Sequence, residues 1–304
     1  MFNPDHLLTL QAVVEEGTVL GAADRLGLTA SAVSQQLSRL QRDVPQPIMH
    51  RRGRANVPTE AAGLLVRLAQ QMRDLDEQTR SELEMLDGQV SGSLTMASFP
   101  TGFRGLLIPA TVGLRERHPN LVVTLHELSP ESAVAAVRAG TVDVALVHDW
   151  TDRHVRLQDG VSDWPIGLDR VDLVAREDHP FTVGPDGIDF AELDHQVWID
   201  DTPGVFSDWL LQSLDAHRLS YRIGATVEHL AIRLRLVLEG FGIGLLPRLG
   251  RGDLPDGLVT LPLKGAPTRR LYAVHRDVSG QRPDVRAALT LMEESWQEAS
   301  ALPS

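Results

Sequence analysis

The stretch Val19–Leu40, VLGAADRLGLTASAVSQQLSRL, predicts two short helices joined by a tight turn. Gly27 marks the end of the first helix, because glycine readily adopts the left-handed conformation that closes a helix. Thr29 is a capping residue in front of a second helix, which we predict at residues 30–40. A hinged pair of this length is typical of helix-turn-helix units.

The second helix has one apolar and one polar face. Val33, Leu37 and Leu40 recur at helical spacing and should face a core. Short hydroxyl and amide side chains on the opposite face can reach base edges and phosphates of DNA. An ordinary surface helix with a solvated polar face is the alternative. The residues of this helix and its cap that we predict to contact DNA are Thr29, Ala30, Ser31, Ser34, Gln35 and Ser38.

A basic segment follows within a dozen residues and favours the DNA interpretation. Arg51, Arg52 and Arg54 surround Gly53, which predicts the tip of a β-hairpin. A guanidinium group can bind phosphate and can enter a narrow minor groove. We therefore predict that these three arginines form a DNA-contacting wing beside the second helix.

The charge of the chain is unevenly distributed. The 304 residues carry a net charge of -12, which by itself argues against a nucleic-acid partner. Residues 1–58, however, contain six arginines and five acidic residues, so this part is slightly positive while the remainder carries the negative charge. The length predicts two or three domains, of which only the first is suited to DNA.

Composition narrows the remaining possibilities. The chain has no cysteine, which excludes disulfides and thiolate chemistry. No apolar run approaches the ~20 residues of a membrane span, so we expect no membrane partner. The N-terminus, with Asp5 and His6, lacks the layout of a signal peptide, and we expect a cytoplasmic protein.

Motifs for catalysis and metal binding are weak. His148, Asp149, Asp152 and His154 are metal-type ligands, but an irregular loop after a strand defines no coordination geometry. No Gly-x-Ser-x-Gly elbow occurs in the chain. We expect no enzyme, no catalytic residues, no metal site and no cofactor.

A long helix should follow the basic hairpin. It can start at Pro58 and Thr59 and run to Asp87, which makes it about 40 Å long. Its apolar residues step by four and three, as in a heptad seam, and we infer a dimerising coiled coil. The alternative is packing on the chain's own regulatory domain. The predicted seam includes Leu65, Leu68, Met72, Leu75 and Leu83.

This arrangement resembles the LysR-type transcriptional regulators over essentially the whole chain. The run Gly21–Leu40 resembles the helix-turn-helix of that family, and Arg51–Thr59 resembles its wing. The long helix is similar to the family's dimerisation linker. The resemblance implies a bacterial DNA-binding regulator.

Three features differ from the family pattern. Ala30 stands where a glutamine is common, so one base contact should be missing. Val44–Pro47 replaces a turn that contains glycine, which should change the angle of the wing. His50 and Arg52 also differ from common choices, so the operator preference cannot be transferred.

Beyond Gly92 strands and helices alternate, which predicts an α/β domain with near-continuous apolar strands of the parallel type. The resemblance implies a two-lobed, periplasmic-binding-protein-like (type 2) effector domain, with crossings between the lobes near Pro165 and Gly265. We predict strands at 94–97, 121–125, 142–147, 171–175, 197–199, 243–246 and 271–275, and helices at 105–117, 131–139, 206–217, 228–239 and 284–297.

The predicted fold class is thus α/β with an N-terminal winged helix-turn-helix. We place this DNA-binding domain at residues 1–58, the linker helix at 59–88 and the effector domain at 89–304. Lobe one comprises 89–165 and 266–304, and lobe two comprises 166–265.

A cleft between two lobes is a natural site for a small-molecule effector. Candidate residues follow strands and open helices, and the resemblance implies that such positions line the site. Ser98 and Ser129 could instead only cap helices. Helix starts favour a carboxylate, whereas acidic residues favour an amino-bearing or neutral ligand. The predicted set is Ser98, Phe99, Pro100, Thr101, Ser129, Asp200, Thr202, Pro203, Val227 and Glu228.

We therefore predict a transcriptional regulator that binds an interrupted palindrome in double-stranded DNA as a homodimer or homotetramer and responds to an effector. The resemblance adds RNA polymerase as a partner. A solute-binding protein or an enzyme would explain the two lobes but not the helix-turn-helix. A DNA-binding regulator without an effector remains the second alternative.

Overall fold

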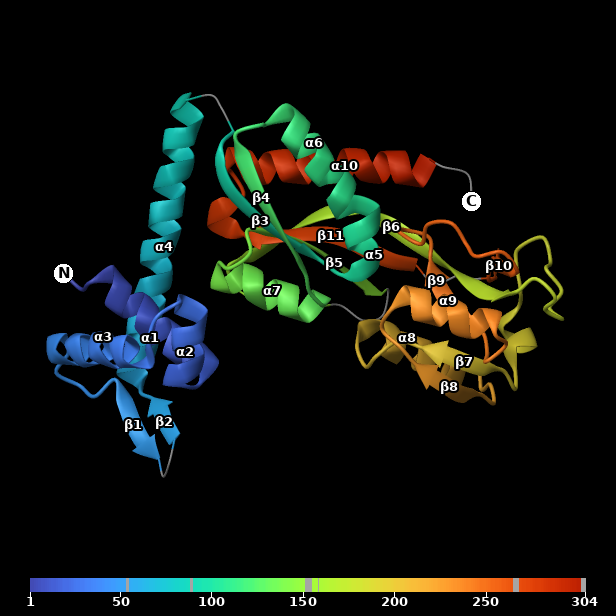
Figure 1. Ribbon diagram of the computed structural model, residues 1–304, viewed down its shortest axis with the longest axis horizontal. Helices are drawn as coiled ribbons and strands as arrows, with labels where there is room; N and C mark the ends of the chain where they lie inside the picture. Colours follow the sequence, from blue (N-terminus) through green and yellow to red (C-terminus); the bar gives the residue numbers. More distant parts are fainter. Residues whose placement is uncertain (53–54, 88–89, 151–154, 158, 265–267, 302–304) are drawn as a thin grey trace. The chain divides into compact units, whose positions relative to one another are not determined.

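A computed structural model describes residues 1–301 apart from 53–54, 88–89, 151–154, 158 and 265–267. The chain divides into two compact units, Met1–Leu83 and Glu84–Ser304 (Figure 1). Each unit has its own hydrophobic clusters, and each is described by itself.

The first unit contains a helix-turn-helix and a hairpin. Its elements are α1 Pro4–Glu16, α2 Val19–Leu26, α3 Ala30–Asp43, β1 Met49–Arg52, β2 Ala55–Pro58 and most of α4 Glu60–Asp87. β1 and β2 pair antiparallel, with Met49 opposite Pro58. The predicted hinged helices are confirmed, and α3 runs three residues beyond the predicted end at Leu40.

Local sequence explains where these helices begin and end. The Thr18 hydroxyl accepts a hydrogen bond from the Gly21 amide at 3.0 Å at the start of α2. The Thr29 hydroxyl accepts one from the Ala32 amide at 3.2 Å at the start of α3. Gly27 has a φ of 63° and closes α2, as glycine does at little steric cost.

The apolar face of α3 lies in the core of this unit. Val33 and Leu40 are fully buried, and Leu37 packs against the same clusters. Leu7 and Leu10 of α1 are also fully buried and join Leu40 in one cluster. The predicted inward face of the helix is confirmed.

The long helix α4 is divided between two environments. Leu65 is only 6% exposed and packs with Leu7 and Leu10 in the unit's own core. Leu68 and Met72 pack against that cluster, while Leu75 is 64% exposed and Leu83 is 61% exposed. The start of the predicted seam therefore faces the chain's own core, and only its later part is open.

The second unit is built around a mixed sheet. Its order is β10-β6-β11-β5-β3-β4, with β9 also paired to β6. β3 is parallel to β4 and β5, but β11 is antiparallel to β5 and β6, so the expectation of parallel strands holds only in part. The strands are β3 Gly92–Ser98, β4 Leu121–Glu127, β5 Val144–Trp150, β6 Val161–Arg176, β9 Gly244–Pro247, β10 Leu258–Leu261 and β11 Thr268–Arg276.

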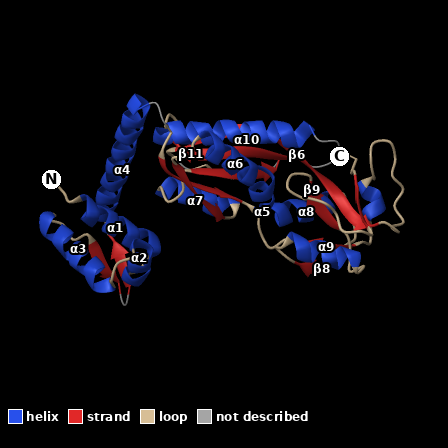
Figure 2. Ribbon diagram, turned by 45° about the horizontal axis from the view of Figure 1, so that its top comes forward, coloured by secondary structure: helices blue, strands red, loops and turns tan. Residues whose placement is uncertain are grey.

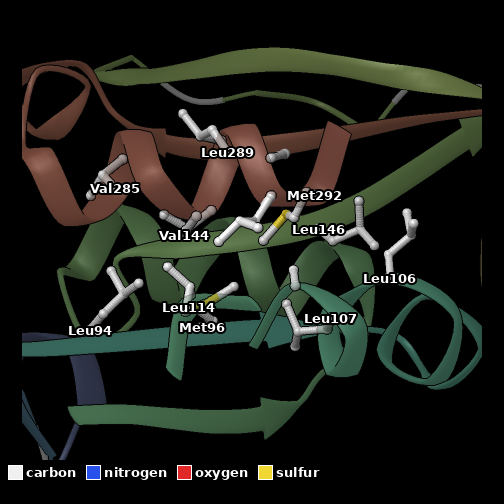
Figure 3. Close-up of a cluster of buried hydrophobic side chains, with 14 of the residues drawn as sticks. Leu94, Met96, Leu106, Leu107, Leu114, Val144, Leu146, Val285, Leu289 and Met292 are labelled. Atoms are coloured by element: carbon white, nitrogen blue, oxygen red, sulfur yellow. The ribbon is translucent and has the colours of Figure 1, made fainter. Parts of the chain in front are cut away.

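Helices cover both faces of the lobe-one strands (Figure 2). Leu107, Leu114, Leu289 and Met292 pack with Val144 in the cluster under α6 and α10 (Figure 3). The opposite face is covered by α7. The helices are α5 Pro100–Gly102, α6 Ile108–Arg117, α7 Pro130–Ala139 and α10 Pro283–Ala301, with a π-helical turn at Phe103–Leu107 between α5 and α6.

Lobe two is built around the second part of β6, which begins at Val171. β7 Val197–Asp200 and β8 Arg222–Thr226 pair in parallel, and β8 had no counterpart among the predicted strands. Two helices complete this lobe, α8 Val205–Ala216 and α9 Leu230–Leu238. Short 3-10 turns lie at Phe190–Leu193 and Asp277–Ser279.

One long strand, β6, carries the chain between the lobes. Its first part, to Arg170, pairs with β11, and from Val171 onward it pairs with β9 and β10. Pro165, near which we predicted the crossing, lies inside the β11-paired part opposite Tyr272. The second predicted crossing, at Gly265, lies outside the described residues. None of the helices described in this structure is long and apolar enough to cross a membrane.

Candidate functional site

The exposed face of α3 carries the polar residues predicted to contact DNA. Thr29, Ala30, Ser31, Ser34, Gln35 and Ser38 are all exposed, and so are Arg39 and Arg42 farther along the helix. Because Val33 and Leu40 anchor the opposite face, these side chains are presented by a fixed scaffold. The prediction did not include Arg39, although its position beside Ser38 places it on the exposed side of the helix.

Several of these hydroxyl groups already have partners within α3. Ser34 donates to the carbonyl oxygen of Ala30 at 2.9 Å, and Ser38 donates to that of Ser34 at 2.8 Å. Their oxygens can still accept hydrogen bonds, whereas the Gln35 amide can both donate and accept. Gln35 therefore has the most versatile hydrogen-bonding group among the predicted residues of this face.

The hairpin supplies the backbone of the predicted wing. His50 lies opposite Val57 and Arg51 lies opposite Asn56 in the antiparallel pair. Arg51 and Arg52 thus occupy the last positions of β1 before the tip. Arg54 lies outside the described residues.

The second unit contains a cavity of about 360 Å³ between its lobes. The starts of helical segments from both lobes line this cleft, which includes Phe99 and Ser129 from lobe one and Thr202 and Glu228 from lobe two. The predicted residues that line the cleft are Phe99, Pro100, Thr101, Ser129, Thr202, Pro203 and Glu228.

Two buried arginines in the cleft were not predicted. Arg269, 2% exposed, pairs with Asp169 at 2.8 Å and donates to the Thr101 hydroxyl at 2.9 Å. Arg233, 4% exposed, pairs with Asp201 at 2.8 Å. The sequence signal for Arg269 is weak, because this residue stands beside Arg270 directly before the apolar run of β11.

Each of these arginines also lies over an aromatic ring. The guanidinium carbon of Arg269 is 5.0 Å from the centre of the Phe99 ring, and that of Arg233 is 5.5 Å from the Phe206 ring. Both rings line the cleft. The lining of the cleft thus combines two aromatic rings with two arginines, whose positive charges are partly neutralised by Asp169 and Asp201.

His148 forms part of the same wall. Its ring is 4.5 Å from that of Phe99 in an edge arrangement and 6.1 Å from that of Trp150. Burial, and secondly the Arg269 guanidinium, lowers the pKa of His148 well below its usual range. A neutral imidazole therefore faces the cleft at physiological pH.

Acidic residues lie mainly at the rim of the cleft. Glu127 and Glu131 from lobe one and Glu228 from lobe two are exposed lining residues. Asp200 is buried behind the lining and accepts a hydrogen bond from the Ser207 hydroxyl at 2.6 Å. Burial raises the pKa of Asp200, with Ser207 acting in the opposite direction.

Three predicted effector residues do not line the cleft. Ser98 is fully buried, Asp200 turns to Ser207, and Val227 packs in the apolar cluster under α9. The helix expected to open at Glu228 begins at Leu230, so Val227 and Glu228 belong to the preceding loop.

Ser129 is a helix cap, but its place in the cleft lining means that capping is not its only possible role. The Ser129 hydroxyl accepts a hydrogen bond from the Ser132 amide at 3.3 Å and also lines the cleft. Ser98 caps no helix, since the residue before α5 is Phe99.

Metal ligation finds no support within the described ranges. These residues contain no group of three or more histidine, aspartate or glutamate side chains placed to hold a metal ion. Of the ligand types noted at 148–154, Asp152 and His154 lie outside the described residues.

Both units match known family models. Residues 4–63 match the bacterial regulatory helix-turn-helix protein model of the lysR family, and residues 87–297 match the LysR substrate binding domain. The chain is 25% identical over 301 residues to a probable HTH-type transcriptional regulator LrrA of Synechococcus elongatus, which covers 98% of this chain and 99% of that protein. A probable RuBisCO transcriptional regulator of Trichormus variabilis is 32% identical over 183 residues, covering 60% of this chain and 53% of that protein.

Solved structures share the fold. A full-length variant of OxyR from Pseudomonas aeruginosa superposes with a TM-score of 0.69 at 19% identity, covering 98% of this chain and 95% of that one. Full-length CbnR, solved with its target DNA, has a TM-score of 0.57 at 17% identity and covers 97% of this chain and all of the other.

Proposed function

The chain belongs to the LysR-type transcriptional regulators, which bind DNA, and on that premise we propose which of its residues read DNA and sense an effector. α3 enters a major groove of an interrupted palindrome, with Ser34 and Gln35 at base edges or adjacent phosphates and Ser31 near the helix start. The observation that carries this proposal is the exposed polar face of α3 opposite the buried Val33 and Leu40.

The arginines of the hairpin extend the contact. Arg51 and Arg54 bind backbone phosphates or the minor groove, and Arg52 adds to them. Replacing Arg54 with Ala should weaken operator binding and lower its salt dependence, because one fewer counterion is released. Identical binding curves across a salt series would exclude this role for Arg54.

The regulator acts as a homodimer or a homotetramer, as an interrupted palindrome requires. The support is the later part of α4, where Leu75 and Leu83 are exposed, whereas Leu65 near the helix start packs in the core of its own unit. Exposed leucines at helical spacing favour burial against a second helix. RNA polymerase is the further partner that a transcriptional regulator of this family would contact.

The cleft of the second unit holds a small-molecule effector. Its volume of about 360 Å³ and its aromatic walls suit a compact organic ligand. The buried Arg269 and Arg233 favour an acidic group on the floor, and the carboxylates of Glu127 and Glu228 favour an amino or hydroxyl group at the rim. Contact with both lobes lets the ligand change the angle between them.

One experiment tests the whole proposal. We would titrate the full-length protein with the DNA upstream of its own coding sequence, in the presence and absence of compounds that raise its melting temperature. A stabilising compound should also change DNA affinity. DNA binding without a response to any stabilising compound would support a regulator without an effector, and no specific binding would contradict the DNA proposal.

The cleft itself is tested by a matched pair of variants. Thr101→Val removes the hydroxyl that accepts the Arg269 hydrogen bond and should lower the affinity of a stabilising compound about tenfold. Thr182→Val changes an exposed loop position outside the cleft and should leave the affinity unchanged. Equal affinities of the two variants would place the ligand elsewhere.

A further inference from the structure

A second cavity lies in the same unit where β6 passes between the lobes. Its volume is about 530 Å³, and it is lined from β6, from the loop that follows β9, and from the end of α10. We call it the arginine cavity. The lining residues on which the argument rests are Leu168, Arg170, Arg248, Arg251, Asp253 and Trp296.

Two of its arginines share a single carboxylate. Arg248 donates to both oxygens of Asp172, at 2.9 and 2.8 Å, and Arg251 donates to one of them at 2.8 Å. Asp172 is buried, so it holds both guanidinium groups in place. Asp172 thus shares its single negative charge between two guanidinium groups.

Two further arginines bring positive charge to this cavity. Arg170 is exposed and forms no ion pair with any residue that the structure describes. Arg104 donates to the backbone carbonyls of Gly250 and Arg251, so its charge also lies beside the cavity without a carboxylate. The negative charge of Asp169 is compensated by Arg269, which leaves Asp253 as the acidic residue on the lining without such a partner.

An apolar wall faces these arginines. Trp296 packs so closely on β6 that a Cβ at Gly167 would lie 2.1 Å from its Nε1 atom. The ring is therefore held beside the cavity, together with the exposed Leu168 and with Ala299. This wall can cover the organic part of a ligand whose charged group contacts the arginines.

We propose that the arginine cavity binds a small phosphate-bearing molecule, at a site separate from the effector cleft. A phosphate dianion accepts hydrogen bonds through several oxygens and can use guanidinium groups that come from different segments. A carboxylate can form a bidentate contact with only one guanidinium group at a time. Asp172 already forms this contact with Arg248. In a chain of net charge -12, a local excess of arginine marks an anion site.

The arginine cavity is connected to the cleft through one buried ion pair. Asp169 lines the arginine cavity, Arg269 lines the cleft, and their side chains meet at 2.8 Å. Asp169 also accepts a hydrogen bond from the Leu249 amide at 3.1 Å. A ligand that shifts the loop after β9 therefore acts on the group that holds Arg269 in the cleft, and by linkage the effect is reciprocal.

Calorimetric titration of the full-length protein tests the site with inorganic phosphate, glucose 6-phosphate and glucuronate. Both phosphates should bind in a saturable way, glucose 6-phosphate more tightly because its sugar reaches the apolar wall, and glucuronate should bind more weakly than either. Arg170→Ala should weaken phosphate binding about tenfold. Asp253→Asn should tighten it, since it removes the rim carboxylate.

Arg115→Ala is the matched control, because Arg115 is also an exposed arginine and lies on α6, outside the arginine cavity. It should bind phosphate as the unmodified protein does. The proposal is overturned if neither phosphate saturates below about 10 mM, if Arg170→Ala and Arg115→Ala behave alike, or if glucuronate binds as tightly as the phosphates. Ser129→Ala changes a cleft residue whose hydroxyl bonds to Ser132. It should leave phosphate affinity within about twofold, and a larger loss would place the anion in the cleft.

Discussion

At the scale of single residues, His148 shows most directly how burial changes the protonation of a side chain. It lies between Phe99 and Trp150 and beside the positive charge of Arg269, so protonation would place a second cation in an enclosed wall. The low pKa of His148 could not be predicted from the sequence, because Phe99 and Arg269 come from distant segments of the chain. We did note His148 there, but only as a metal-type ligand.

The lowered pKa of His148 makes stability depend on pH. The neutral form is favoured in the folded state, so this stability is present above the ordinary pKa of about 6.5 and is lost as the pH falls through the lower folded value. The free energy of unfolding, measured by urea titration, should decrease below neutral pH. His148→Gln should reduce this slope.

His126→Gln provides the comparison, because it removes an exposed histidine from the edge strand β4. It should keep the slope of the unmodified protein. If His148→Gln and the unmodified protein lose stability in parallel between pH 7 and pH 5, the imidazole is not a buried neutral group.

At the scale of elements, α4 shows that one amphipathic helix can serve two surfaces. Heptad spacing predicted a single seam, but Leu65 faces the core of its own unit, whereas Leu75 and Leu83 are exposed. Spacing identifies apolar positions and cannot tell which partner covers them. The helix-turn-helix supplies that partner for the first turns.

The two parts of α4 should therefore respond differently to substitution. Leu75→Glu should shift the protein to monomers in sedimentation velocity without lowering its stability, since a charge replaces an exposed side chain. Leu65→Ala should instead lower the free energy of unfolding by about 2–5 kcal/mol, because it leaves a cavity in the core.

Leu20→Glu, on α2, controls for the added charge, because Leu20 is 66% exposed and thus similar to Leu75. It should leave the sedimentation coefficient unchanged. An unchanged coefficient for Leu75→Glu would show that this part of α4 does not hold the subunits together.

Sequence patterns predicted elements best where local signals were strong. α3 was predicted at its observed start, because the capping residue Thr29 precedes it. β8 was missed because its burial alternates between intermediate and exposed, which leaves little apolar pattern. The first part of β6 was missed because its pairing with β11 joins residues 98 to 115 positions apart.

The residues of the candidate sites were also predicted best where the local sequence alone sets their position. The outward residues of α3 could be predicted from helical phase alone, since that face is set by its own sequence. Arg233 and Arg269 could not be found in this way, because α9 and β11 bring them to the cleft only in the folded unit. The turn of Asp200 toward Ser207 also depends on tertiary packing.

At the scale of the whole molecule, β6 is the common structural link of both cavities in the second unit. It pairs with β11 as far as Arg170 and then with β9 and β10. Asp169, at the end of the first part, contacts Arg269 from the cleft and the Leu249 amide beside the arginine cavity. A ligand in either cavity should therefore alter the same segment of the chain.

Hydrogen exchange of backbone amides tests this link. Saturating glucose 6-phosphate should slow exchange at residues 248–252 and also at residues 99–103, which lie at the cleft. Arg170→Ala should lose both effects at the same ligand concentration, and Arg115→Ala should keep them. Protection confined to 248–252 would show that the two cavities are independent.

DNA recognition by α3 is the central claim, and fluorescence anisotropy of labelled operator DNA tests it most directly. Gln35→Ala should weaken binding to the upstream DNA by about tenfold and reduce the preference over a scrambled duplex, because a specific base contact is worth about 1–3 kcal/mol. Gln71→Ala, an exposed glutamine on α4, should change neither value. Equal affinity and equal preference for Gln35→Ala and the unmodified protein would contradict the assignment of α3 as the helix that reads DNA.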